Sequence, residues 1–82
     1  MNNTMKKLLE LTIRYPTFKQ CVETYMLAVE RHYKKVAKQY FITIDNILLL
    51  FAYDVQIITP KCMCDIRNHL ITYAKTFKMN IP

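Results

Sequence analysis

The chain of 82 residues contains no glycine. Glycine supplies the positive φ angles that tight β-hairpin turns and G1 bulges use, so its absence argues against a sheet-rich fold. It also excludes the glycine-rich loops that hold phosphates in Walker-type and dinucleotide-binding sites. The sequence therefore predicts an all-α protein and excludes the familiar classes of nucleotide-dependent enzyme.

Length and hydrophobic content predict one helical domain over residues 1–82. Hydrophobic residues make up 52% of the chain, which is enough for a compact core. Because the length is near the lower limit for folding without disulfides or metals, the margin of stability is expected to be thin. Self-association would bury more apolar surface, so a homodimer is among the expectations.

The cysteines and the distribution of charge predict a cytoplasmic protein. Cys21, Cys62 and Cys64 form an odd set, which fits reduced thiols better than a disulfide framework. The first 15 residues carry charges at helical spacing, unlike a signal peptide. The uncharged run over residues 46–53 is too short to span a bilayer, so no membrane association is expected.

Apolar periodicity and the positions of threonine and proline predict a compact bundle or an orthogonal array of about four helices. Asn3 or Thr4 would cap the first helix, Thr43 the third and Thr59 the fourth. Residues 44–58 are apolar on nearly every side, so a buried strand remains the alternative there. The expected helices cover roughly residues 4–15, 17–40, 43–55 and 60–78.

The helix expected over residues 17–40 has the clearest pattern. Its apolar stripe advances in alternating steps of four and three, as in a core-facing helix or a coiled-coil seam. A histidine, His32, falls within this stripe and is expected to be a core or boundary residue. The stripe consists of Phe18, Val22, Tyr25, Val29, His32 and Val36, and its flank includes Met26 and Tyr33.

Twelve lysines and arginines against six acidic residues give a net charge of +6. Such an excess favours acidic partners, either nucleic acid or an acidic protein surface. The alternative is an ordinary solvated helix face, partly neutralised by a Glu30–Lys34 pair at i, i+4 spacing. The chain is also rich in Lys, Asn, Ile, Tyr and Thr, as is typical of proteins encoded by an AT-rich genome. Such a genome raises the lysine content without any function. The predicted phosphate-binding residues are Arg31, Lys34, Lys35, Lys38, Arg67 and Lys75.

The sequence is expected to bind no metal or other cofactor and to have no catalytic activity. Cys62 and Cys64 are separated by one residue, whereas paired zinc cysteines are usually two to four apart. Cys62 and His69 would share one helix face, and Cys21 and His32 would complete a ligand set only if the fold brought them there. The cysteines are therefore interpreted as small hydrophobic residues. No catalytic triad or carboxylate pair is evident, so no catalytic residue is assigned and enzyme activity is not expected.

The segment over residues 40–70 contains a set of positions that match a known family, namely Phe41, Thr43, Leu48, Leu50, Ala52, Tyr53, Asp65, Ile66 and Leu70. Through these residues it resembles the scaffold half of winged-helix regulators of the MarR and SarA type. The resemblance implies that the preceding helices form a dimerisation region. Only residues 71–82 follow the matching segment, which leaves no room for the family's recognition helix and wing. The implied DNA-reading part is thus missing or remodelled, which would suit pairing with a protein better.

Two functional hypotheses follow. The first is a small basic, non-enzymatic protein that is nucleic-acid-associated or regulatory, with a phage, virus or mobile element as a compatible source. The alternative is a protein–protein interaction module, either a small subunit of a larger assembly or an inhibitor that docks on a host enzyme. The predicted partner-binding residues of this alternative are Tyr25, Met26, Val29 and Tyr33.

Overall fold

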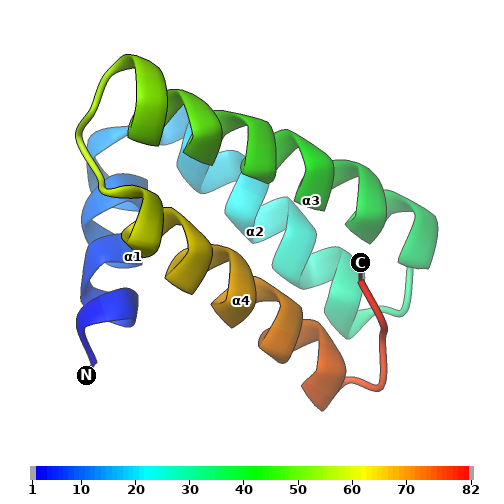
Figure 1. Ribbon diagram of the computed structural model, residues 1–82. Coiled ribbons are helices and arrows are strands. Elements are labelled where there is room, and N and C mark those ends of the chain that lie inside the picture. The colour runs from blue at the N-terminus through cyan, green and yellow to red at the C-terminus, as the bar shows by residue number, and fades with distance from the viewer. Residues whose placement is uncertain (1, 82) are drawn as a thin grey trace.

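The computed structural model describes residues 2–81 and confirms the predicted all-α fold of four helices (Figure 1). A short π-helical segment, η1, continues the third helix without a break. The described residues contain no strand, so the segment that could have been a buried strand is helical through residue 54. The elements are α1 (Asn3–Arg14), α2 (Pro16–Glu30), α3 (Lys34–Leu49), η1 (Leu50–Asp54) and α4 (Pro60–Thr76).

The boundary between the second and third helices differs from the prediction. A helix was expected over residues 17–40, but α2 ends at Glu30 and α3 begins at Lys34. Thr43, the expected cap, lies inside α3, where its hydroxyl donates to the carbonyl oxygen of Gln39 at 3.1 Å. His32 was expected on the core stripe, but it lies exposed in the turn between the two helices.

The turn between α2 and α3 is a Schellman motif without glycine. The His32 N–H donates to the Val29 carbonyl oxygen at 3.1 Å, and the Tyr33 N–H donates to that of Ala28 at 2.8 Å. His32 takes the left-handed conformation, with a φ of 60°. This geometry reverses the chain, so α2 and α3 lie side by side as a helical hairpin (Figure 1).

A second Schellman motif without glycine ends α4. Lys78 has a φ of 59°, and its N–H donates to the Lys75 carbonyl oxygen at 2.9 Å. The following N–H, from Met79, donates to the Ala74 carbonyl oxygen at 3.0 Å. The chain then folds back, and the side chains of Met79 and Ile81 are buried in the core.

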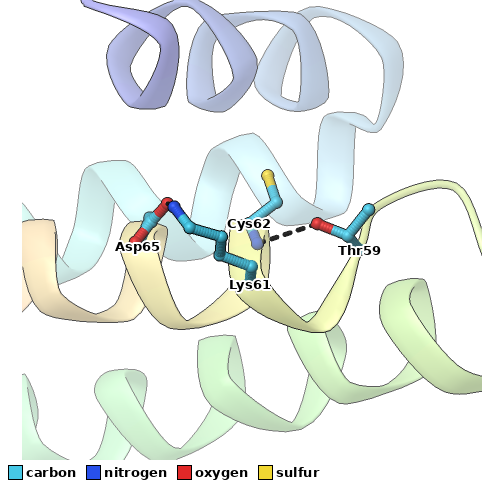
Figure 2. Close-up of polar contacts among 4 residues, drawn as sticks. All are labelled: Thr59, Lys61, Cys62 and Asp65. Atoms are coloured by element: carbon cyan, nitrogen blue, oxygen red, sulfur yellow. Dashed lines mark hydrogen bonds and ion pairs between the residues drawn. The ribbon is translucent and has the colours of Figure 1, made fainter.

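Two of the helix starts have the capping geometry expected of polar side chains. At α1 the cap is Asn2, whose side-chain oxygen accepts from the Met5 N–H at 2.8 Å, rather than Asn3 or Thr4. At α4 the predicted Thr59 cap is confirmed, since its hydroxyl oxygen accepts from the Cys62 N–H at 3.0 Å (Figure 2). Proline at the first position of α4 fixes a helical φ without losing an intrahelical hydrogen bond.

The core lies between the α2–α3 hairpin and α4, and α1 packs against α2 and α4 at the end remote from the hairpin turn (Figure 1). The Tyr25 hydroxyl is satisfied inside the core, because it donates to the Leu70 carbonyl oxygen of α4 at 2.7 Å. No helix within residues 2–81 is long and apolar enough to cross a membrane. The largest fully buried side chains are Phe18, Tyr25, Val29, Ile44, Leu48, Ile66 and Leu70.

Candidate functional site

One end of the bundle gathers six exposed cationic side chains, which we term the basic end. They come from the α2–α3 turn, the first two turns of α3 and the end of α4, which lie at the same end of the molecule (Figure 1). The ion pairs among the described residues are Lys7–Glu10, Lys61–Asp65 (Figure 2) and Arg67–Asp45, so none involves the basic end. The basic end consists of Arg31, Lys34, Lys35, Lys38, Lys75 and Lys78.

Glu30 is the acidic residue nearest in sequence to this cluster, and it does not neutralise Lys34. The helix break separates the two residues, so the i, i+4 pair expected from the sequence does not form. Instead, a Glu30 carboxylate oxygen accepts a hydrogen bond from the Tyr73 hydroxyl of α4. Burial, together with this hydrogen bond to a carboxylate, raises the pKa of Tyr73 to about 12. The bond also fixes the ends of α2 and α4 beside each other.

The first turn of α3 places like charges together. Lys34 and Lys35 occupy its first two positions, and no acidic residue lies in this turn. Its N-cap residue, Tyr33, provides no side-chain hydrogen bond, so the first amide groups are left uncapped. Because a helix N-terminus carries partial positive charge, these lysines add to a positive potential instead of offsetting it.

Arg67 was predicted to bind phosphate, but the structure gives it a different environment. Its Nε atom lies 3.1 Å from a carboxylate oxygen of Asp45, and its guanidinium carbon lies 5.5 Å from the ring centroid of Phe41. These contacts join α4 to α3 and balance the charge of Arg67. Arg67 therefore lies outside the basic end and its binding of phosphate stays a prediction, whereas Lys75 lies within the basic end.

The four predicted partner-binding residues do not form one exposed face. Tyr25 and Val29 are completely buried, so neither can contact a partner in this fold. Met26 is half-buried against the core. Tyr33 is 58% exposed and lies within the basic end, between Arg31 and Lys34 in the chain. The apolar stripe predicted from spacing is thus mainly the interior side of α2.

An apolar pocket of about 280 Å³ lies between α1, α2 and α4. Its volume is slightly below the range of about 300–1,000 Å³ that is typical of small-molecule sites. The sequence did not indicate this pocket, because it depends on how α1 leans against the other two helices. Its walls include Leu8, Leu9, Val22, Met26 and Leu70, with Lys19, Glu23 and His69 among the polar contributors.

The cysteine and histidine side chains do not form a metal-binding cluster within the described residues. Cys21 is buried, Cys62 is half-buried and Cys64 is exposed. Burial is the main cause that raises the pKa of the Cys62 thiol. Over residues 2–81, no three His, Cys, Asp or Glu side chains lie close enough together to hold a metal ion.

Comparison of the chain with protein-family models, with curated proteins and with solved structures finds no match. The resemblance to winged-helix regulators therefore stays a prediction.

Proposed function

We propose that this protein binds nucleic acid through its basic end, in a non-enzymatic role. The observation that carries the proposal is the gathering of six exposed cations, none of them in an ion pair within the described residues, at one end of the bundle. Exposed cations on one surface can neutralise successive phosphates and release counterions. The proposed contacts are Arg31, Lys34, Lys35, Lys38, Lys75 and Lys78.

The start of α3 supports a phosphate ligand in particular. Uncapped amide groups at a helix N-terminus donate to phosphate oxygens, and the partial positive charge there attracts anions. Lys34 and Lys35 occupy this turn even though their charges oppose the helix dipole. A bound phosphate would turn that unfavourable arrangement into a favourable one.

The exposure of Tyr33 favours single-stranded nucleic acid over duplex as the ligand. Its side chain is exposed in the turn that carries Arg31 and precedes Lys34, and an exposed aromatic ring near cations offers a stacking platform for an unpaired base. We therefore expect tighter binding to single strands, and a Tyr33→Ala variant that loses this preference.

The test is fluorescence anisotropy with labelled single- and double-stranded oligonucleotides at low and at physiological salt. Substituting Lys34, Lys35 and Lys38 by glutamine should weaken binding at least about tenfold and reduce the salt slope by about three. A matched control replaces Lys6, Lys19 and Lys61 by glutamine, which removes the same charge away from the basic end. Absence of binding at low salt, or equal weakening by both triple variants, would contradict the proposal.

A protein-docking role is the second candidate, and the exposure of Tyr33 is what favours it. An exposed aromatic side chain in a turn flanked by cationic residues suits an acidic protein surface, where charge steers the approach. In that case, an acidic polypeptide such as polyglutamate would bind the protein in a Tyr33-dependent manner. Oligonucleotides would then fail to bind even at low salt.

A further inference from the structure

The apolar pocket between α1, α2 and α4 forms where α1 and α2 meet at a sharp corner. Tyr15 alone joins the two helices, and its backbone is extended, with a φ of −124° and a ψ of 94°. The helices diverge from this corner, and α4 packs beside both of them (Figure 1). Thr12 and Lys19, close to the corner in sequence, therefore border the same space as Met5 and Met26, which are farther from it.

The walls and the size of the pocket define the apolar part of a ligand. An apolar cavity of about 150 Å³ can hold benzene. On that scale, the volume of about 280 Å³ has room for an apolar body of roughly ten carbon atoms. Leu9 is 43% exposed, so a ligand can enter from this side. The apolar side chains of the walls are Met5, Leu8, Leu9, Val22, Met26 and Leu70.

Two methionines on different helices favour an adaptable fit. Met5 comes from α1 and Met26 from α2, and both are half-buried. The methionine side chain is flexible and polarisable, so it can follow the outline of a ligand and contact the edge of an aromatic ring. The pocket is thus suited to a flat ring system as well as to an aliphatic chain.

Three ionisable side chains on the border of the pocket determine the charge of the ligand. Lys19 and Glu23 are exposed, and neither belongs to an ion pair within residues 2–81. His69 is half-buried on α4. Lys19 and His69 can both donate hydrogen bonds to an anion, whereas Glu23 can only accept them. The net charge of +6 also attracts an anionic ligand to the molecule.

The two hydroxyl groups on the border are already used within the protein. The Thr12 hydroxyl donates to the Leu9 carbonyl oxygen at 2.8 Å, and the Tyr73 hydroxyl donates to Glu30. Neither has a proton left for a ligand. The donors that remain on the border are therefore the ammonium group of Lys19 and the imidazole of His69.

We propose that this pocket binds a small carboxylic acid with an apolar body of about ten carbon atoms. The apolar body lies against the leucine and methionine side chains, and the carboxylate accepts hydrogen bonds from Lys19 and His69. Aromatic acids and medium-chain fatty acids share this chemistry. No residue that lines the pocket belongs to the basic end, so this binding is separate from that of nucleic acid.

The first experiment is an NMR titration of the full chain, isotope-labelled at its methionine methyl groups, with naphthoate as the ligand. The methyl resonances of Met5 and Met26 should shift saturably, with a dissociation constant on the order of 100 µM for a ligand of this size. Met63 and Met79 are buried in the core outside the pocket, so their resonances should stay in place. Decanoate should reverse the shifts by displacing naphthoate. Absence of a saturable shift, or equal shifts of all four methionines, would overturn the proposal.

The role of charge is tested by removing one charge at a time. Lys19→Gln should weaken the binding of naphthoate about threefold, and Glu23→Gln should strengthen it about twofold. Lys6→Gln and Asp54→Asn are the matched controls, because they remove the same charges from exposed positions outside the pocket. Neutral naphthamide should bind about threefold more weakly than naphthoate. Equal affinity for the amide and the acid would show that the border does not select an anion, contrary to the proposal.

The location is tested by filling the pocket. Leu9→Trp places a large side chain at its open side and should weaken naphthoate binding at least about tenfold. Ile13→Trp is the matched control, because Ile13 is 79% exposed on the same helix and does not line the pocket. Oligonucleotide binding should be unchanged in both variants. Unaltered naphthoate binding by the Leu9→Trp variant would place the ligand elsewhere and refute the assignment.

Discussion

At the scale of single residues, the absence of glycine means that other residues must take the left-handed conformation. His32, Gln56 and Lys78 each take a positive φ at the end of a helical segment, where glycine is the commonest residue. A side chain with a β-carbon is strained in this conformation by about 1 kcal/mol or more. Because a turn signal normally rests on glycine, the break at His32 could not be predicted from residue type.

Replacing His32 by glycine is predicted to stabilise the protein. Relief of the left-handed strain should outweigh the entropy that glycine adds to the unfolded chain, for a net gain of about 0.5–1 kcal/mol. Urea unfolding followed by circular dichroism measures this difference. Gln39→Gly, in the exposed interior of α3, is the matched control and should lower stability by about 1 kcal/mol. A loss of stability in His32→Gly would contradict the strain argument.

At the scale of elements, the sequence predicted the number of helices and the start of α4, but placed one boundary wrongly. The steps of four and three along α2 continue through His32 and Val36, so the pattern gives no sign of a break. The core-facing residues of α3 instead form a new series that begins with Ala37 and Phe41. Four of the six predicted phosphate-binding residues come from this region, and they lie in the turn and in the first two turns of α3 instead of on one continuous helix. Their gathering with Lys75 depended on the helix break, which periodicity cannot indicate.

The first turn of α3 is predicted to limit the stability of the protein. Lys34→Glu and Lys35→Glu should each raise the free energy of unfolding by about 0.3–1 kcal/mol, because an acid there interacts favourably with the helix dipole. Thermal unfolding at low ionic strength measures the gain. Lys38→Glu is the control and should have a smaller effect, since the dipole acts mainly within the first turn. Equal effects at the three positions would instead indicate relief of general charge repulsion.

At the scale of the whole molecule, two tyrosine hydroxyls connect α2 and α4 in opposite directions. Tyr25 of α2 donates to a carbonyl oxygen of α4, and Tyr73 of α4 donates to Glu30 of α2. Burial, with a smaller contribution from Tyr73, raises the pKa of Tyr25 to about 12. The sequence marked Tyr25 as a stripe residue, but the stripe alone could not distinguish a buried anchor from a docking surface.

Stability is therefore predicted to fall as the pH rises from about 10 to about 12. In that window the folded protein holds tyrosine protons that the unfolded chain releases, so the free energy of unfolding decreases with pH. The double variant Tyr25→Phe, Tyr73→Phe should be less stable at neutral pH and less sensitive to alkali. Urea unfolding across this pH range tests it, with Tyr33→Phe as the control. Parallel pH profiles for the wild type and the double variant would refute the assignment.

The π-helical turn at Leu50–Asp54 has a consequence for how the length of the chain can vary. A π turn holds one residue more than an α turn closed by the usual hydrogen bonds. Deleting a residue from most of α3 would rotate every later side chain by about 100° and remove Ile44 or Leu48 from the core. A deletion within the π turn can be absorbed by rewinding it as α-helix. We therefore expect the protein to tolerate deletion of one residue within Leu50–Asp54.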